Sequence, residues 1–351
     1  MQLRTGNRSN STRNDDEPNI AAIVLAAGKG TRMKSLIPKV MHEILGVPLL
    51  AYVLENLRSI ELSPIVVVTG FGKDPVCELC RKFDVVTVHQ EEQMGTAHAV
   101  GCARDALAGH DGHVLVICGD TPLVRSSTIE KFLGLHLETQ GDISVLSVIV
   151  SDPQGYGRIL REPPGDGRFV DIVEEKDADD LERMIKEVNT GSYAVNSRVL
   201  FGLIDKVDAQ NSQSEYYLTD IVRIGASHGL VVNAFCVAQE TEALGVNSRK
   251  DLSFAEEVML DRIQEYWMEQ GVTFQLRKTC YIDKTVRLAR DVVVGAHSVL
   301  AQGTTIGEGA RIGPYAHLVN VHVGDRFEVP AGTVLQNCSI GVDDKIGFIE
   351  K

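Results

Sequence analysis

The chain has 351 residues, with 48 acidic and 35 basic side chains and a net charge of -13 at pH 7. This charge disfavours general binding to nucleic acid or to anionic membranes, because both need a basic surface on the protein. The length exceeds that of a usual single domain and predicts one large domain with a smaller one.

Residues 1–18 contain almost no apolar side chains. They lack the apolar core of a secretory signal and the length of a membrane-spanning helix, so we expect a disordered tail on a cytoplasmic protein. The seven cysteines are an odd number and are scattered along the chain, which fits a reducing compartment. Cys77 and Cys80 form the only CxxC pair. Without a second pair or a nearby histidine, they indicate two thiols on a helix rather than a zinc site.

Residues 19–247 alternate short apolar runs with longer amphipathic segments, a pattern typical of strands and crossover helices in a mostly parallel sheet. Strands are predicted at residues 22–25, 65–69, 85–88, 114–118 and 143–150, and helices at residues 48–59 and 126–139. We therefore expect a Rossmann-like, doubly wound α/β domain over residues 19–250. Its ligands should gather at the carboxyl ends of the strands.

One long helical pattern follows over residues 251–271, with Gly271 placed to end it. It predicts a linker helix within residues 251–274.

Aliphatic residues recur at every sixth position from Ile282 to Leu318, with small or β-branched residues four places later. A hexapeptide repeat of this kind is typical of a parallel β-helix in which the aliphatic side chains stack inward. The register shifts after Leu318 and again before Ile340 and Ile346. We expect three to four coils over residues 275–351.

A glycine-containing loop, LAAGKGTRM at residues 25–33, follows the first predicted strand. Small residues let backbone N–H groups close around phosphate oxygens, and Lys29, Arg32 and Lys39 supply cations. The loop matches neither the P-loop nor the dinucleotide-binding pattern, because residue 33 is Met and no Lys-Ser/Thr follows the glycines. By itself it is also compatible with a tight turn that carries solvated charges.

This loop, with PKV at residues 38–40, closely resembles the signature of sugar-1-phosphate nucleotidyltransferases. Further matching motifs follow in the same order and spacing. They are Gln90 with QMGTAHA at residues 93–99, CGD at 118–120, GYGR at 155–158, IVEEK at 172–176, NTG at 189–191, EYYLTD at 215–220 and GVN at 245–247. Residues 19–247 thus resemble the uridyltransferase half of the bifunctional N-acetylglucosamine-1-phosphate uridyltransferase/glucosamine-1-phosphate acetyltransferases. The resemblance implies a nucleotide-diphospho-sugar transferase fold followed by a short left-handed β-helix.

The resemblance also implies roles for particular residues around the uridine. They are Leu25, Ala26, Gly28, Gln90, Gly95 and Thr96. The amide of Gln90 is able to donate to and accept from the uracil edge, which favours UTP over purine nucleotides, although a solvated side chain at a strand end is the alternative. Thr96 is also placed to cap a helix that begins near Ala97.

A magnesium site is implied at Asp120 and Asn247. Asp120 follows an apolar strand and should lie at the carboxyl edge of the sheet, where a metal that bridges phosphates belongs. Outside this context, Asp120-Thr121-Pro122 would be typical of a turn or a helix cap.

The implied sugar pocket consists of hydrogen-bonding groups that suit sugar hydroxyls. They are Gly157, Glu174, Asn189, Tyr217 and Thr219. Two residues depart from the family pattern: Ser214 replaces a common glycine, and Cys118 replaces a common tyrosine, which is expected to alter packing near the pyrophosphate.

We therefore expect an in-line displacement in which the phosphate of N-acetylglucosamine 1-phosphate attacks the α-phosphorus of UTP and pyrophosphate leaves. The phosphate is already an anion, so no general base is required, and His98 is expected to be structural. Catalysis is expected from alignment and from charge neutralisation by Mg²⁺, Arg32 and Lys39.

Three alternatives are open. The first is a nucleotidyltransferase for another sugar 1-phosphate, such as glucose 1-phosphate. The second, an acetyltransferase, is disfavoured because that site in the resembling enzymes lies in coils beyond those present here, and its basic, histidine-containing stretch has no counterpart. The third is a non-catalytic assembly module, which would be expected to lack Arg32, Lys39, Asp120 or Asn247. The resemblance also predicts a homotrimer formed through the β-helix.

Overall fold

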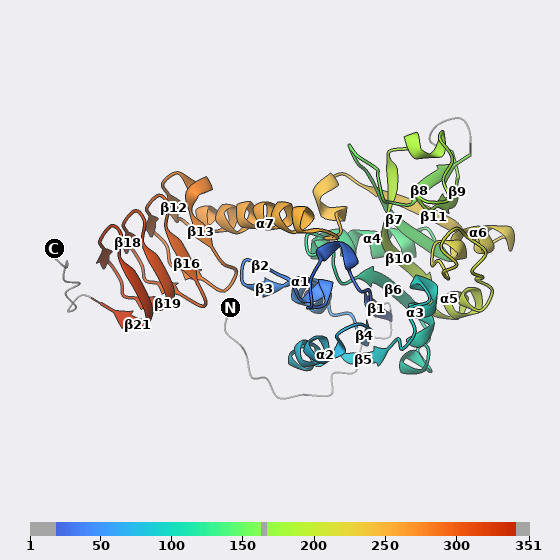
Figure 1. The fold of residues 1–351 in the computed structure, drawn as a ribbon, viewed down its shortest axis with the longest axis horizontal. Helices are drawn as coiled ribbons and strands as arrows, with labels where there is room; N and C mark the ends of the chain where they lie inside the picture. The colour runs from blue at the N-terminus through green and yellow to red at the C-terminus, as the bar shows by residue number, and fades with distance from the viewer. Residues whose placement is uncertain (1–18, 163–166, 342–351) are drawn as a thin grey trace.

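The computed structural model describes residues 19–162 and 167–341. The predicted disordered tail at residues 1–18 and the repeat position Ile346 lie outside these ranges. Figure 1 shows a large α/β domain and a stack of short strands, joined by the long helix α7 (Arg249–Glu269). Within the described ranges, no helix combines the length and the apolar character needed to cross a bilayer.

The α/β domain is built on a nine-stranded sheet with the order β11-β7-β10-β6-β1-β4-β5, to which β8 and β9 attach beside β10. The strands are β1 (Ile20–Ala26), β4 (Ile65–Thr69), β5 (Val86–His89), β6 (His113–Cys118), β7 (Ile143–Ile149), β8 (Arg158–Arg161), β9 (Phe169–Val173), β10 (Glu187–Asn196) and β11 (Val232–Val237). Along the main order, β10 pairs antiparallel with β6 and β7, whereas the other pairs are parallel. The predicted mostly parallel sheet is therefore confirmed.

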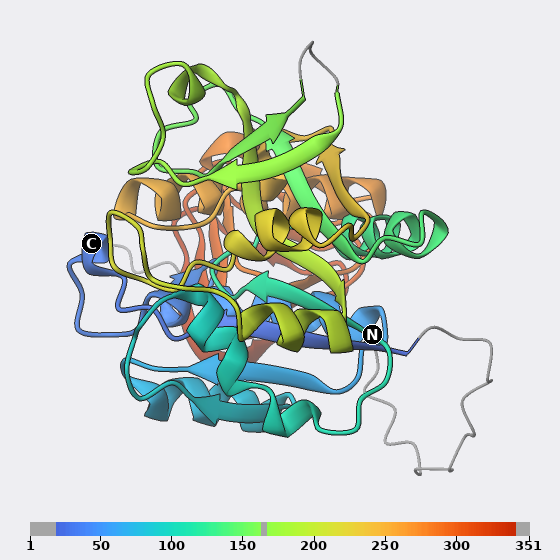
Figure 2. The same cartoon turned by 90° about the vertical axis from the view of Figure 1, so that its right-hand side faces the viewer.

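Helices cover both faces of this sheet because alternate side chains of its strands point to opposite sides. Ala21 and Ile23 of β1 face one core, and Ala22 and Val24 face the other. The first core is covered by α3 (Thr96–Cys102), α5 (Ser197–Ile204) and α6 (Asp220–Ser227), and the second by α1 (Leu49–Ser59), α2 (Lys73–Lys82) and α4 (Ser126–Glu138). Figure 2 shows these layers with the strand stack behind them. The fold is doubly wound, as predicted.

The order of the strands creates a switch point beside β1. From β1 the chain proceeds to β4 and β5 on one side, and it then returns to β6 on the other side. In open α/β sheets, ligands bind outside the carboxyl ends of the strands at such a point. A ligand site is therefore expected at the loops that follow β1 and β6.

Helix α7 packs against both parts of the molecule. Ser248 and Asp251 form a capping box at its start. Ala255 and Met259 are buried in a core shared with the α/β domain, whereas Trp267 packs against the core of the strand stack. The helix ends at Glu269 and the chain turns at Gly271, with a φ of 90°. Residues 273–274 form strand β12 (Thr273–Phe274) of the stack, so this end of the predicted linker is not helical.

The strand stack follows the hexapeptide repeat, since each aliphatic position lies in register with the position three repeats later. Ile282 pairs with Leu300, and Leu300 with Leu318, in parallel. The strands are β13 (Tyr281–Ile282), β14 (Arg287–Leu288), β15 (Val293–Val294), β16 (Val299–Ala301), β17 (Thr305–Ile306), β18 (Arg311–Ile312), β19 (His317–Val323), β20 (Glu328–Val329) and β21 (Val334–Ile340). The stacked parallel strands are consistent with the predicted β-helix, and its left handedness stays a prediction.

The shift of register after Leu318 also has a structural counterpart. Strand β19 runs on through this corner, where Asn320 adopts a φ of 52°. Its first half pairs with β16 and its second half with β17, so one strand serves two faces of the stack. The shortened repeat therefore keeps the aliphatic residues pointing inward.

Candidate active site

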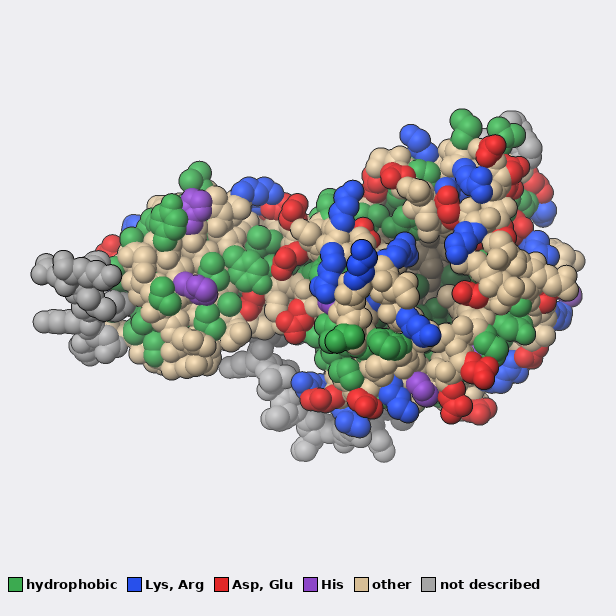
Figure 3. All heavy atoms as spheres, in the orientation of Figure 1, with side chains coloured by type: hydrophobic (Ala, Val, Ile, Leu, Met, Phe, Trp, Pro, Cys, Tyr) green, Lys and Arg blue, Asp and Glu red, His purple; other side chains and the backbone are tan. Residues whose placement is uncertain are grey.

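A cavity of about 370 Å³ lies at the switch point, between the ends of β1, β5 and β6. Figure 3 shows that this face of the α/β domain is hollowed and that Lys and Arg side chains gather beside the hollow. Eight of the predicted site residues line the cavity, namely Leu25, Ala26, Gly28, Lys39, Gln90, Gly95, Thr96 and Asp120. The sequence motifs at the ends of three strands thus meet in one place.

The glycine loop borders this cavity with its backbone. A Cβ at Gly28 would meet no protein atom within 4 Å, so this glycine leaves room for a group that is not part of the protein. Gly30 has a φ of 57°, and a Cβ there would come within 2.7 Å of Lys39 Cβ. Met33 anchors the following turn η1 (Thr31–Met33) in the interior, while Arg32 is exposed beside it. The loop is therefore fixed by contacts with the protein at Gly30 and Met33 and is open to the cavity at Gly28, as phosphate binding requires.

Lys39, Asp120 and Asn247 meet at one side of the cavity. Lys39 Nζ forms an ion pair with Asp120 Oδ2 and donates a hydrogen bond of 3.0 Å to Asn247 Oδ1. The Val246 N–H donates to the Asp120 carbonyl at 2.9 Å, and the Asn247 N–H donates to Asp251 Oδ2 at 3.0 Å. A carboxylate and an amide oxygen from distant parts of the chain thus converge on a single cation.

Gln90 is buried at the end of β5, and its amide already has protein partners. Nε2 lies 3.1 Å from the Gly95 carbonyl oxygen and 2.9 Å from His98 Nδ1, so both of its N–H groups are used when His98 carries its proton on Nε2. Only Oε1 is left to meet a ligand. The role of Gln90 in binding uracil stays a prediction, and in this arrangement of hydrogen bonds its part would be that of an acceptor. The same arrangement gives His98 an orienting contact with Gln90.

Thr96 does not cap the helix that it begins. The N-cap of α3 is Gly95, with no side-chain capping bond, and Thr96 Oγ1 instead accepts the N–H of Leu218 at 2.9 Å. Gly95 adopts a φ of 118°, and a Cβ there would lie 2.4 Å from the Tyr216 carbonyl oxygen. The capping alternative was wrong because the segment around residue 216 packs directly on this helix start.

Four of the five predicted sugar-pocket residues are connected through short contacts. Thr219 Oγ1 donates to Glu174 Oε1 at 3.2 Å, and the Asn189 N–H donates to the Gly157 carbonyl at 2.8 Å. A Cβ at Gly157 would lie 3.5 Å from Glu174 Oε2, so Gly157 is next to Glu174 and the two hydrogen-bonded pairs lie side by side. The Asn189 side chain donates to the Tyr193 hydroxyl at 2.7 Å.

The fifth residue, Tyr217, is buried nearby, and its hydroxyl accepts a hydrogen bond of 2.6 Å from Gln213 Nε2. Burial raises the pKa of Tyr217, and the charge of Glu174 contributes in the same direction. Burial also raises the pKa of Glu174, although the hydrogen bond from Thr219 opposes this change. The pocket thus holds a carboxyl group that is protonated more readily than an exposed glutamate.

This pocket adjoins the cavity through two residues. Cys118 lines the cavity, and a Cβ at Gly191 would lie 3.0 Å from its Sγ. Gly191 in turn donates its N–H to Asn189 Oδ1 at 2.9 Å. Glu215 also lines the cavity, and its charge helps to raise the pKa of Glu174. Cys118 itself is half-buried, and desolvation raises its thiol pKa to about 12, so it acts as an apolar wall rather than as a nucleophile.

The motifs contained two further residues of this region to which no role was assigned. Gln93 donates to the Ala27 carbonyl at 2.6 Å and so ties the cavity wall to the glycine loop. Tyr156 lies close enough to Arg32 and Asp120 that both charges affect its pKa, which burial raises. Their place inside matching motifs was the only sign in the sequence.

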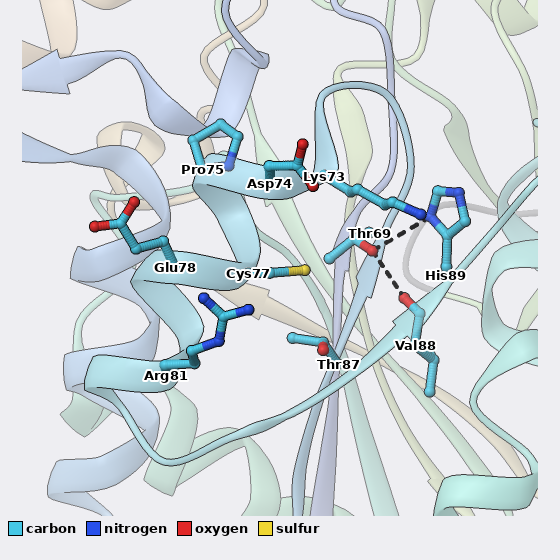
Figure 4. A pocket seen from close by; sticks show the side chains of 10 residues that line it. All are labelled: Thr69, Lys73, Asp74, Pro75, Cys77, Glu78, Arg81, Thr87, Val88 and His89. Atoms are coloured by element: carbon cyan, nitrogen blue, oxygen red, sulfur yellow. Dashed lines mark hydrogen bonds between the residues drawn. The ribbon is translucent and has the colours of Figure 1, made fainter.

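A larger groove of about 700 Å³ lies elsewhere, between α2 and β5 (Figure 4). Cys77 and Arg81 of α2 line it together with Thr69 of β4 and Thr87 of β5, and neither the glycine loop nor Asp120 lines the groove. Cys77 and Cys80 carry free thiols on α2, as predicted, and burial raises the pKa of Cys80 to about 12. Across residues 19–162 and 167–341, no cluster of three or more His, Cys, Asp and Glu side chains suits a metal ion.

Comparisons with known proteins agree with the motifs. A family model described as a MobA-like NTP transferase domain matches residues 22–161. The bifunctional protein GlmU of Geotalea uraniireducens (strain Rf4) is 40% identical over 330 residues, which cover 94% of this chain and 72% of that protein. GlmU of Streptococcus thermophilus (strain CNRZ 1066) is 38% identical over 369 residues, which cover 94% of this chain and 80% of that protein.

A solved structure of UDP-glucose pyrophosphorylase complexed with UDP-glucose superimposes with a TM-score of 0.57 at 20% identity, covering 70% of this chain and all of that one. At this identity the likeness shows the fold alone. The family resemblance predicted from the motifs is confirmed by the relatives. The chain therefore belongs to the family of the bifunctional GlmU proteins and carries the nucleotidyltransferase half of that family.

Proposed function

We propose that this protein transfers the uridylyl group of UTP to N-acetylglucosamine 1-phosphate, with Mg²⁺, and forms UDP-N-acetylglucosamine and pyrophosphate. The observation that carries the proposal is the convergence of Asp120, Asn247 and Lys39 beside an open glycine loop, in a cavity that also contains Gln90. The loop proposed to bind phosphates and the side chain proposed to select the base thus line the same cavity.

Gln90 is the residue that would select the nucleotide. Its Oε1 is a hydrogen-bond acceptor, and both of its N–H groups are used within the protein when His98 carries its proton on Nε2. Uracil presents a donor at N3, and cytosine presents an acceptor at the same position. An acceptor in the cavity therefore favours UTP over CTP, because CTP would leave two acceptors facing each other without a hydrogen bond.

Asp120 and Asn247 would hold the magnesium ion. One carboxylate and one amide oxygen fit the preference of Mg²⁺ for oxygen ligands and for a coordination shell completed by water and substrate phosphates. When bound, Mg²⁺ supplies positive charge for the phosphate oxygens. Tyr156 and Asp251 surround these ligands, and Asp251 holds Asn247 in place through its backbone N–H.

The protein itself would align the two substrates and neutralise the charge of their phosphates. The glycine loop presents N–H groups to the phosphates, and Lys39 and Arg32 offset the negative charge that is shared between the entering and leaving oxygens. The attacking phosphate is an anion at neutral pH, so the reaction needs no proton acceptor. Glu174, Thr219 and Asn189 would orient the sugar hydroxyls and the N-acetyl group, and the hydrogen bond of Thr219 to Glu174 and that of Asn189 to Tyr193 support this role by fixing their side chains.

A panel that crosses sugar 1-phosphates with nucleoside triphosphates, with pyrophosphate release as the readout, tests the proposal. UTP with N-acetylglucosamine 1-phosphate should give the highest kcat/KM. If glucose 1-phosphate is the better substrate, the proposed sugar is wrong while the reaction class stands. If no pair releases pyrophosphate, the chain is a non-catalytic module.

We further propose that the 351-residue chain assembles as a trimer through its strand stack and does not transfer acetyl groups. Light scattering at several protein concentrations tests the first statement, and a monomer throughout would contradict it. Incubation with acetyl-CoA and glucosamine 1-phosphate tests the second, and release of CoA above background would contradict it.

A further inference from the structure

The ammonium group of Lys39 lies between the two side chains that we propose as magnesium ligands. Its Nζ is paired with Asp120 Oδ2 and donates to Asn247 Oδ1 at 3.0 Å. A single cation thus already satisfies the carboxylate and the amide oxygen.

From this contact we propose that Lys39 is a place-holder cation. It occupies the metal position while no phosphate is bound, and it releases Asp120 and Asn247 when a nucleotide places its phosphates in the glycine loop. The inference rests on the proposed magnesium site. An ammonium group and a magnesium ion cannot share the same oxygen atoms, because their charges repel strongly at that distance. Metal binding is thereby coupled to nucleotide binding.

The side chain of Lys39 is able to reach both Asp120 and a phosphate bound at the glycine loop. The turn η2 (Lys39–Met41) fixes its backbone, and its Cβ lies so close to the glycine loop that only glycine fits at residue 30. A phosphate held by that loop would therefore lie beside the stem. The four-carbon side chain of lysine is flexible, so a change of rotamer is sufficient to move its ammonium group from Asp120 to such a phosphate.

The burial of Asp120 explains why a cation is needed beside it even without a metal. Asp120 is 8% exposed, and a carboxylate at that depth is costly without a counter-charge. Asn247 is neutral, so Lys39 provides the positive charge that the site needs before a metal arrives. The same residue then serves the phosphates, which bring their own negative charge and their own metal.

Metal binding without nucleotide tests the proposal. Mn²⁺ alone is titrated into the full chain, and the free ion is followed by electron paramagnetic resonance. Lys39→Met should bind Mn²⁺ at least about tenfold more tightly than the parent, because the competing cation is gone. Lys29→Met is the matched control, since it removes the same charge from an exposed side chain of the same cavity. It should stay within about twofold of the parent, because water and salt screen an exposed charge.

Equal Mn²⁺ affinity in the parent and in Lys39→Met would overturn the place-holder role. An equal gain in Lys29→Met would also overturn it, because net charge would then explain the effect. Thermal unfolding provides a second readout if Lys39→Met is less stable than the parent. Mg²⁺ alone should raise the Tm of Lys39→Met and leave that of the parent unchanged; a Tm of Lys39→Met that does not respond would contradict the proposal.

A further titration separates failure of this inference from failure of the proposed magnesium site. With UTP present, Asp120→Ala should bind Mn²⁺ more weakly than the parent. If it does, and Lys39→Met still shows no gain without nucleotide, only the place-holder role is wrong. If Asp120→Ala binds Mn²⁺ as the parent does, the metal site itself is wrongly placed and the inference falls with it.

Discussion

The buried histidine His136 should make the protein less stable as the pH falls below neutral. Its ring lies between His113 Nδ1 at 2.9 Å and Ser144 Oγ at 2.7 Å, and the side chain is fully buried. Burial lowers the pKa of His136 from 6.5 to about 4, with a further contribution from His113, while the nearby Asp142 opposes the change. The folded protein thus keeps this imidazole neutral at a pH where the unfolded chain has already bound a proton.

The sign and the size of the effect follow from proton linkage. Well above pH 6.5 neither state is protonated at this residue, so His136 does not change the free energy of unfolding with pH there. Between pH 6.5 and about 4 the unfolded chain gains a proton that the folded chain lacks, so stability falls as the pH decreases. At ~1.4 kcal/mol per pH unit, the full gap corresponds to a loss of about 3 kcal/mol at pH 4.

Urea unfolding between pH 7.5 and pH 4.5 measures this loss, with His136→Gln as the test variant and His317→Gln as the control. His136→Gln is less stable at neutral pH because it loses the contact with His113, but its stability should fall less steeply below pH 6.5. His317 is exposed on the strand stack, so its replacement should leave the slope of the parent unchanged. Parallel pH curves for the parent and His136→Gln would refute the reasoning.

Three further predictions concern the proposed reaction. Asp120→Ala should lower kcat by about 10²–10³-fold while the circular dichroism spectrum stays that of the folded protein, because the proposed carboxylate ligand of Mg²⁺ is gone; activity within a few-fold of the parent at saturating Mg²⁺ would argue against the assignment. Gln90→Ala should lower the preference for UTP over CTP by ~1–3 kcal/mol in kcat/KM, and an unchanged ratio would show that Gln90 does not select the base. Because burial raises the pKa of Glu174, the KM for the sugar phosphate should increase as the pH falls toward that pKa, where an acceptor for sugar hydroxyls is lost. Glu174→Gln should remove this part of the pH profile and keep the part due to the substrate phosphate; identical profiles in the two proteins would place Glu174 outside the pocket.

The secondary structure could be predicted from the sequence where apolar side chains follow a regular pattern. The stacking of Ile282, Leu300 and Leu318 could be predicted, because a spacing of six residues brings equivalent positions into register every third repeat. The strands β1, β4 and β6 could also be predicted, since their continuous apolar runs are buried on both faces. The position of β10 between β6 and β7 could not be predicted. The residues of a strand do not show which strands it pairs with, or whether the pairing is parallel or antiparallel.

For the site, the motifs predicted which residues come together but not what they touch. Eight of the predicted residues line one cavity, yet the pairing of Lys39 with Asp120 and Asn247 joins segments that are far apart in the sequence and depends on how their side chains meet in the fold. Thr96 is a similar case. Its sequence context favoured a helix cap, but its actual partner, Leu218, belongs to a distant segment that the local pattern does not include.

Helix α7 links the thermal behaviour of the two halves of the molecule. A stack of short repeats on its own unravels from its ends, one coil at a time. Here Leu260 and Ile263 pack into the hydrophobic core on the α/β side and into that of the coils, so unwinding this helix exposes apolar surface in both. Lys284 of the first coil reinforces the connection by packing over the ring of Tyr52, 4.0 Å from its centroid. The coils next to α7 are therefore expected to melt together with the sheet in a single calorimetric transition, and the coils farther away to fray first.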